Sequence, residues 1–380
     1  MRLRNRLGTG LVAAIVGVAL VATACGKSSK SSSSNGTTGT TTAQVACATG
    51  TITGAGSTFV QTIAQQWIKD FQAKCSGATI NYQGVGSGAG ITQFNAGTVD
   101  FGASDAVMKP EEEAAAKAKG GDVLHIPWSA GGIAIEFHLS GVTDLKLSPD
   151  TLAGIFAGTV KTWNASEIKA DNSGASLPST PIQVVHRSDG SGTTFIFTDY
   201  LSKVSPEWSD KVGESTAVEW PVGLGGKGNE GVAALVSRTD GAIGYVEYAY
   251  AKQNKLAYAL LSNKEGVFNQ PNAGSFQAAA ANADWQKAPG YYLLLTDQPG
   301  KESWPITGAS FILMYKKQDK PETAKQVLQF FDWSYRNGQK MADELDYVPM
   351  PENVVKLVED AWKKEMSDPG NKPVWTGPAS

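Results

Sequence analysis

Residues 51–59 read Thr51-Ile52-Thr53-Gly54-Ala55-Gly56-Ser57-Thr58-Phe59, a short extended run that ends in glycine and serine. The helix predicted after it has an apolar face at helical spacing, formed by Phe59, Ile63, Trp67, Ile68 and Phe71. The same order recurs in Gly84-Val85-Gly86-Ser87-Gly88 and in Asp189-Gly190-Ser191-Gly192-Thr193, which follow strand-like runs at 78–83 and 181–186. The first N–H groups of a helix lack helical partners, and the helix dipole is positive there. The three loops therefore predict a pocket for a small oxyanion, with Arg187 as a nearby cation.

Strand-like and helix-like segments alternate along the rest of the chain. We expect strands at 99–103, 124–127, 132–139, 241–245 and 311–315, and helices at 108–119, 148–156, 194–204 and 230–238. Asn229 is expected to cap the last of these helices. Two C-terminal helices carry apolar faces, with Val327, Leu328, Phe331 and Trp333 on one and Val354, Val355, Val358 and Trp362 on the other. This alternation predicts α/β layers with a mostly parallel sheet in each of two lobes, and ligands bind at the carboxyl ends of such strands.

The N-terminal region predicts export and a lipid anchor. Residues 1–24 form a signal peptide, with Arg2, Arg4 and Arg6 before an apolar run at 11–21. Residues 22–25, Ala-Thr-Ala-Cys, resemble a bacterial lipobox, in which Cys25 becomes lipidated, for example by palmitate. The alternative is ordinary signal cleavage beside an incidental cysteine. Residues 25–46 are expected to form a flexible Ser/Thr-rich tether that places the protein on the extracytoplasmic face of the bacterial cell membrane.

Two other cysteines, Cys47 and Cys75, remain in the exported part. Such a pair predicts a disulfide bond between the start of the globular part and the end of its first helix. Two free buried thiols are the alternative, because the sequence does not give the Cα separation that decides between them.

Size and charge restrict the function further. The chain has 380 residues, a net charge of −3 and 41% hydrophobic residues. About 330 residues follow the tether, enough for roughly two domains. No positive field of the whole protein would steer anions or nucleic acid, so an anion site must be local. His125, His138 and His186 are scattered, and we expect neither a metal nor a cofactor.

Three other motifs have weaker support. Gly84, Gly86 and Ala89 match a relaxed dinucleotide fingerprint with Asp105 downstream, but the intervening strand is short. Asp189, Ser191 and His186 suggest a serine hydrolase, but the serine is not in a G-x-S-x-G motif, and His186 and Arg187 should point to opposite faces of a strand. The glycine-rich 223–228 lacks the ending of a phosphate-binding P-loop and is interpreted as a turn before a helix. Each serine loop could also be a simple N-cap, and Arg187 beside Asp189 a surface ion pair.

Six stretches resemble the phosphate-binding protein of bacterial ABC phosphate importers: Thr53–Phe59, Tyr82–Ser87, Val99–Asp105, Arg187–Thr193, Trp220–Asn229 and Gly241–Tyr250. The resemblance extends in order over residues 50–365. It implies a two-lobed periplasmic-binding-protein-like fold of type II, with a hinge and the ligand in the cleft between the lobes. The first lobe would comprise 47–130 plus 306–380, and the second would be inserted as 131–305.

The resemblance also implies a function and a ligand set. The function is high-affinity binding of inorganic phosphate outside the cytoplasm and delivery to the permease and ATPase subunits of an importer, without enzymatic activity. The implied phosphate-binding residues are Ser57, Thr58, Phe59 through its N–H, Ser87, Asp105, Arg187, Ser191, Gly192 and Thr193. Ser57 stands where alanine is also familiar and adds a hydroxyl donor. His186 stands where arginine is familiar and should alter only surface charge.

A mechanism follows from these residues. Asp105 should repel an anion that brings no proton, so we hypothesise that it rejects sulfate and accepts phosphate. Asp189 should brace Arg187 through a salt link. A ligand that contacts both lobes should favour their closure. Two other classes of protein compete with this function: a phosphatase, and an adhesin or signalling receptor built on the same fold. An enzyme would need a nucleophile with a base in reach, and the sequence offers none.

Overall fold

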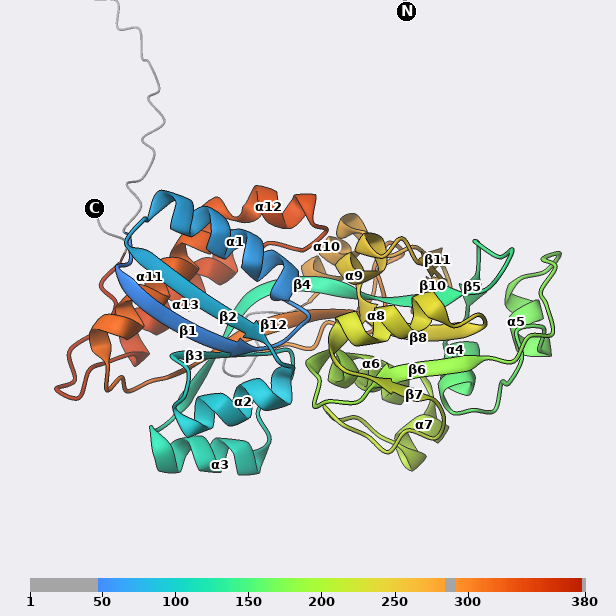
Figure 1. Ribbon diagram of the computed structural model, residues 1–380, viewed down its shortest axis with the longest axis horizontal. Helices are drawn as coiled ribbons and strands as arrows, with labels where there is room; N and C mark the ends of the chain where they lie inside the picture. Colours follow the sequence, from blue (N-terminus) through green and yellow to red (C-terminus); the bar gives the residue numbers. More distant parts are fainter. Residues whose placement is uncertain (1–46, 284–291, 378–380) are drawn as a thin grey trace, which may run out of the picture. The chain divides into compact units, whose positions relative to one another are not determined.

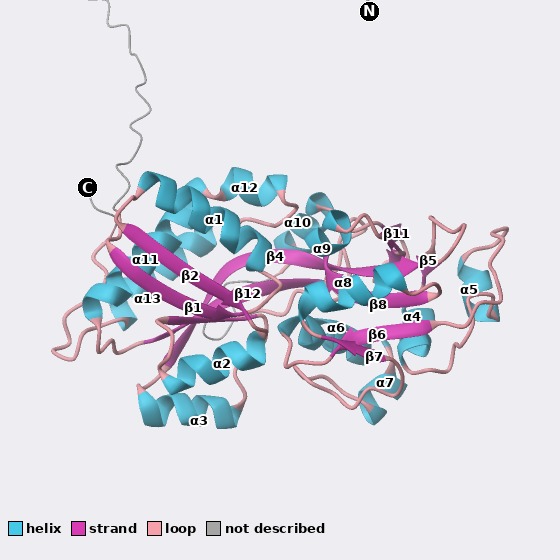
Figure 2. Cartoon of the chain, viewed as in Figure 1, coloured by secondary structure: helices cyan, strands magenta, loops and turns pink. Residues whose placement is uncertain are grey.

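The main sheet of this computed structural model has the strand order β2-β1-β3-β12-β4-β8-β6-β7, with β9 paired to β4 (Figures 1 and 2). The structure describes residues 47–283 and 292–377. The strands are β1 (Gly50–Gly56), β2 (Ala78–Gly84), β3 (Phe101–Ser104), β4 (Val123–His138), β6 (Gln183–Arg187), β7 (Leu224–Gly226), β8 (Ala242–Glu247), β9 (Ala257–Tyr258) and β12 (Thr307–Tyr315).

The sheet as a whole is mixed, but each of its two parts is mostly parallel, which confirms the prediction of a mostly parallel sheet in each lobe. β1 lies parallel between β2 and β3, and β6 lies parallel between β7 and β8. β12, however, is antiparallel to β3 and β4, and β4 is antiparallel to β8. The cause is the path of the chain: β4 leaves the first part of the sheet and β12 returns to it, so these two strands run in opposite directions.

β4 joins the two parts of the sheet as one strand, where the sequence predicted two. Residues 123–132 of β4 pair with β12, and residues 133–138 pair with β8. The register between β4 and β12 shifts next to Pro127, whose lack of an N–H disfavours regular pairing: Phe311 pairs with Pro127 and Ser310 with Ser129, so β4 has one extra residue. We call the part built on β2, β1, β3 and β12 the first lobe and the part built on β8, β6 and β7 the second lobe. The domain bounds expected from the sequence, 47–130 plus 306–380 and 131–305, stay a prediction.

Helices cover both faces of the sheet in the first lobe (Figure 1). α1 (Gln61–Lys74) and α11 (Pro321–Asn337) pack on one face, and α2 (Ser87–Ala96) and α3 (Pro110–Lys119) on the other. α12 (Gln339–Glu344) packs against α1, and α13 (Glu352–Glu365) completes the C-terminal part. The predicted apolar faces of α1, α11 and α13 are buried. Amphipathic spacing was therefore a correct guide to these helices.

In the second lobe, α8 (Gly228–Arg238) and α6 (Gly192–Val204) lie on opposite faces of β8. A Cβ at Gly244 would meet Val232 and Val236 of α8, whereas the ring of the next residue, Tyr245, stacks on Phe197 of α6 at 4.4 Å. The remaining helices are α4 (Pro149–Phe156), α5 (Ser166–Asp171), α7 (Pro206–Lys211), α9 (Tyr248–Gln253) and α10 (Ala273–Ala281). A small sheet has the order β11 (Phe268–Asn269), β10 (Leu260–Ser262), β5 (Lys146–Leu147).

Cys47 and Cys75 form the predicted disulfide bond, with their Cα atoms 5.2 Å apart. Cys75 directly follows α1, so the bond ties the start of the described chain to the end of that helix. The predicted signal peptide, Cys25 and the tether lie outside the described residues. Over the described ranges, no helix has the length and apolar character needed to cross a membrane, and no cluster of His, Cys, Asp and Glu could hold a metal ion.

Candidate anion-binding site

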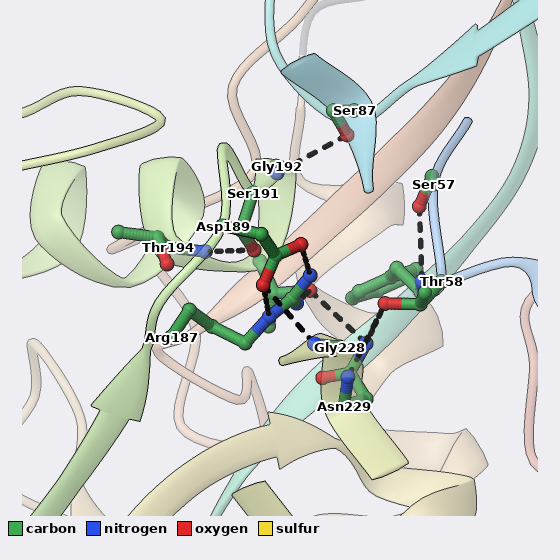
Figure 3. Close-up of polar contacts among 12 residues, drawn as sticks. Ser57, Thr58, Ser87, Arg187, Asp189, Ser191, Gly192, Thr194, Gly228 and Asn229 are labelled. Carbon is green, nitrogen blue, oxygen red and sulfur yellow. Dashed lines mark hydrogen bonds and ion pairs between the residues drawn. The ribbon is translucent and has the colours of Figure 1, made fainter. Parts of the chain in front are cut away.

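The three glycine-serine loops each connect the carboxyl end of a strand to a helix. The first joins β1 to α1, the second joins β2 to α2, and the third joins β6 to α6. The second and third loops touch across the lobes: the Gly192 N–H donates to Ser87 Oγ at 3.1 Å, and the Gly88 N–H donates to the Gly190 carbonyl at 3.0 Å. Figure 3 shows Ser57, Thr58 and Ser87 on one side of the site and Arg187, Asp189 and Gly192 on the other.

Glycine is required where these loops meet. Gly86 has φ +90°, and a Cβ there would lie 2.4 Å from an Asp189 carboxylate oxygen. A Cβ at Gly192 would lie 2.4 Å from an Asp105 carboxylate oxygen and 2.6 Å from Ser87 Oγ. The absence of side chains at these two positions lets polar groups of the two lobes approach one another.

Arg187 supplies a cation that is almost fully buried. Its side chain is 1% exposed, and it binds Asp189 through Nε at 2.8 Å and Nη2 at 2.6 Å. Its Nη1 donates to Thr193 Oγ1 at 3.4 Å. Burial by itself raises the pKa of Asp189. The hydrogen bonds and charge of Arg187 and the Gly228 N–H lower it by more than burial raises it, so the pKa lies below its usual range. Asp189 is therefore ionised, and the fork holds the guanidinium in one orientation.

Asp105 is the second buried charge and is surrounded by hydroxyl groups. Its Oδ2 accepts from Ser57 Oγ at 2.7 Å and from Ser87 Oγ at 3.4 Å, and its Oδ1 accepts from Ser310 Oγ on β12. Burial raises the pKa of Asp105 to about 6, although the three serine hydroxyls and Arg187 oppose the shift. Ser310 was not among the site residues predicted from the sequence, because it lies 205 residues from Asp105.

Asn229 is a site residue that the sequence reasoning assigned wrongly. It was predicted to cap its helix, but α8 begins at Gly228 with Lys227 as its N-cap. The buried Asn229 amide instead donates to Thr58 Oγ1 at 2.9 Å and to Thr193 Oγ1 at 3.3 Å, and its oxygen accepts from the Glu247 N–H at 3.1 Å. It therefore links a hydroxyl of the first lobe to one of the second.

The glycine run at 223–228, which directly precedes Asn229, was interpreted from the sequence as a turn before a helix. It forms β7, which pairs with β6, and leads into α8. Its last glycine, Gly228, donates its N–H to Asp189 Oδ1 at 3.0 Å. This segment is thus part of the support for Arg187 and more than a connection.

The capping alternative applies to part of the site. Ser191 Oγ accepts the Thr194 N–H at 3.0 Å as the N-cap of α6 (Figure 3). Ser57 Oγ accepts the Phe59 N–H at 2.9 Å within its own loop. Ser87 is different, because its Oγ accepts from the N–H groups of Asp105 and Gly192, which belong to other segments.

The hydrolase alternative finds no support in the contacts of its residues. The His186 ring stacks on Trp220 with centroids 4.8 Å apart, and its Nδ1 lies 3.0 Å from the Arg187 carbonyl oxygen. Ser191 is occupied with its helix, as described above. These residues therefore do not form a nucleophile and base pair.

Comparisons with known proteins agree with the geometry. Residues 41–365 match the model of the PBP superfamily domain. The phosphate-binding protein PstS of Pasteurella multocida is 51% identical over 327 residues, which are 86% of this chain and 93% of that protein. PstS of Haemophilus influenzae is 49% identical over 83% of this chain and 93% of that protein. Among solved structures, a human phosphate-binding apolipoprotein matches with a TM-score of 0.67 at 23% identity, over 82% of this chain and 94% of that chain.

Proposed function

We propose that this chain, which belongs to the PstS phosphate-binding proteins of the PBP superfamily, captures inorganic phosphate outside the cytoplasm with high affinity. It then delivers the phosphate to an ABC permease and its ATPase for import. The observation that carries the proposal is the buried guanidinium of Arg187, which is oriented by Asp189 and donates to Thr193, a residue that Asn229 links to Thr58 of the first lobe (Figure 3). A planar cation among neutral donors is suited to a small oxyanion.

Hydroxyl and guanidinium hydrogens that have no protein acceptor among the described residues support a ligand between the loops. Thr58 Oγ1 accepts from Asn229, and Thr193 Oγ1 accepts from Arg187 and Asn229. Within the described ranges neither hydroxyl donates to a protein acceptor, so each has its hydrogen free for an anion. Arg187 likewise keeps N–H groups beyond the two that Asp189 accepts. We assign the phosphate to the set expected from the sequence: Ser57, Thr58, Phe59, Ser87, Asp105, Arg187, Ser191, Gly192 and Thr193.

Asp105 would select for a protonated anion. Its carboxylate can accept a hydrogen from phosphate, which retains at least one proton near neutral pH, whereas sulfate has none to give. Sulfate would therefore leave a buried carboxylate facing an anion oxygen without a hydrogen between them.

Access to the site requires the lobes to move. Ser57, Thr58, Ser87, Asp105, Arg187, Ser191 and Thr193 are each 4% exposed or less. The donors come from loops of both lobes, so bound phosphate would favour the closed arrangement by its contacts to each. We propose that the closed form is the one the permease recognises. Lipidation at Cys25 and the tether would hold the protein at the membrane; this rests on the lipobox-like sequence.

Titration calorimetry on the soluble part, starting at Cys47, tests the proposal. Phosphate should bind with a Kd of about 1 μM or tighter, which corresponds to ~8 kcal/mol and needs only a few charge-assisted hydrogen bonds. Sulfate should bind far more weakly, and a phosphoester should not be turned over. Small-angle scattering should show compaction when phosphate is added. Equal affinity for the two anions would contradict the assignment of Asp105, and no phosphate binding at all would overturn the function.

A further inference from the structure

Three tyrosine hydroxyls hold three consecutive carbonyl groups of the first loop. The carbonyl oxygens of residues 57, 58 and 59 accept, in that order, from Tyr82, Tyr250 and Tyr347, each at 2.7 Å. Tyr82 is on β2, Tyr250 is on α9, and Tyr347 follows α12. The loop is therefore fixed from three separate elements, and one of them, α9, follows β8 of the second lobe.

Peptide geometry makes these contacts relevant to the anion. In a planar trans peptide the C=O and the following N–H point in opposite directions. A carbonyl held by a tyrosine therefore orients the N–H of the next residue to the other side. Tyr250 holds the Thr58 carbonyl and so sets the direction of the Phe59 N–H. That N–H points to Ser57 Oγ, and the Ser57 hydroxyl in turn contacts Asp105. The Phe59 N–H is therefore directed to the side of the loop on which the anion site lies.

Tyr347 has one hydrogen but two acceptors within reach. Its Oη lies 2.7 Å from the Phe59 carbonyl oxygen and 2.8 Å from Glu247 Oε2, and all three residues are fully buried. A hydrogen on Glu247 resolves this, because Oε2–H can donate to Tyr347 while Tyr347 donates to Phe59. Glu247 Oε1 accepts the Ala249 N–H at 3.0 Å, so a protonated carboxyl group satisfies every partner.

The surroundings of Glu247 favour this protonated form. Burial raises the pKa of Glu247 to about 8, and the charges of Asp346 and Asp105 add to the shift, while the bonds from Ala249 and Tyr347 oppose it. Tyr248 and Tyr250 of α9 also face it. Since the pKa is raised, the carboxyl group is neutral at pH 7 and ionises as the pH rises through about 8.

We propose that Tyr82, Tyr250 and Tyr347 are positioning residues of the anion site, that their hydroxyls aim the N–H groups of the first loop at the ligand, and that a protonated Glu247 donates to Tyr347 to complete this network. The proposal rests on the proposed function for its ligand. It assigns to the tyrosines a contribution to affinity that they make without touching phosphate.

Single-hydroxyl deletions test it, with inorganic phosphate as the probe. Y82F, Y250F and Y347F each remove one donor and keep the ring. Y335F is the matched control, because the buried Tyr335 donates to the Pro127 carbonyl at 2.6 Å, away from the loops. All four variants should lower the unfolding temperature of the phosphate-free protein, but only the first three should raise the phosphate Kd, by about fivefold to tenfold. We expect the largest effect from Y250F.

Kd values for all three loop variants within a factor of about two of wild type, as expected for Y335F, would overturn the proposal, because the first loop would then present its N–H groups equally well without these hydroxyls. A second readout needs no ligand. In the phosphate-free protein, the amide NMR resonance of Phe59 should shift in Y250F and stay in place in Y335F. If wild type bound no phosphate, the proposed function would be wrong. The tyrosine network would be rejected separately, by a Phe59 amide resonance that does not shift in Y250F.

The pH profile tests the Glu247 hydrogen. Between pH 7.5 and 9, values chosen around the pKa of about 8, wild-type phosphate affinity should fall several-fold, because an ionised Glu247 draws the Tyr347 hydrogen away from the Phe59 carbonyl. E247Q keeps a donor toward Tyr347 and cannot titrate, so its profile should be flatter than that of wild type. Parallel profiles for wild type and E247Q would show that Glu247 does not supply this hydrogen.

Discussion

The first and third loops follow the same plan of strand, glycine turn and helix, yet they hold their functional groups in different ways. The first loop is held through its backbone, by tyrosine hydroxyls on its carbonyl groups, and its Ser57 hydroxyl donates to Asp105. The third loop is held through a charge, because Asp189 accepts two hydrogen bonds from one edge of the Arg187 guanidinium.

This difference separates two tasks of a binding site. The third loop offers the strong, long-range attraction of a cation, which any small oxyanion would feel. The first loop offers directed neutral donors beside a carboxylate, which only an anion with a hydrogen satisfies. We therefore expect changes in the third loop to lower affinity for all anions, and changes around Asp105 to alter the choice between them.

The largest effect should come from R187Q. Removing the cation deletes charge-assisted hydrogen bonds and leaves Asp189 without its partner, so phosphate affinity should fall about a thousandfold, or ~4 kcal/mol. Calorimetry measures this directly. R336Q is the control, because Arg336 also forms ion pairs, here with Asp332 and Glu359 on α11 and α13. A loss below tenfold in R187Q, or an equal loss in R336Q, would contradict the role of the third loop.

A smaller effect, on selectivity, is expected from D105N. The amide keeps an acceptor for the serine hydroxyls but adds N–H donors and removes the charge. The preference for phosphate over sulfate should therefore fall by about a hundredfold, with both affinities measured by calorimetry. D100N provides the control, since Asp100 also accepts hydrogen bonds, in this case two from Thr53, but is not among the residues assigned to the site. An unchanged preference in D105N would show that selectivity originates elsewhere.

The sequence identified the loops because their signals are local. Glycines beside a strand end, a serine at a helix start and apolar residues at helical spacing each depend only on near neighbours in the chain. The presence of β1 and α1, the bounds of β2 to within one residue and the burial of the α11 face followed from such patterns. The resemblance to a family then supplied the ligand set, which local patterns alone could not.

What the sequence missed depends on distant partners. Asn229 binds Thr58 from 171 residues away, and Tyr250 and Tyr347 reach the first loop over 192 and 288 residues. An asparagine before a helix most often caps it, so the local interpretation was reasonable and the tertiary contact overrode it. β4 was split in two for the same reason, since its continuity depends on pairing with β12 and β8 and not on its own residues.

The smallest effect, and the one that isolates Asp105, is the pH dependence of sulfate binding. The pKa of Asp105 is raised to about 6, so its carboxyl group gains a proton as the pH falls through that value. About a tenth of the molecules carry this proton at pH 7 and about nine tenths at pH 5, as the linkage between protonation and pKa requires. If only the protonated form accepts sulfate, its affinity should rise about tenfold over this range.

Sulfate is the better probe for this measurement because it does not titrate between pH 5 and pH 7, whereas phosphate does. His186, the nearest histidine to the third loop in sequence, has a pKa below its ordinary value because of burial. D105N should remove the pH dependence and hold sulfate affinity at the higher level throughout. A wild-type profile that stays flat, or one that survives in D105N, would mean that another group controls the rejection of sulfate. The first loop would then attract any small oxyanion, as the third does, and would not select for an anion that carries a proton.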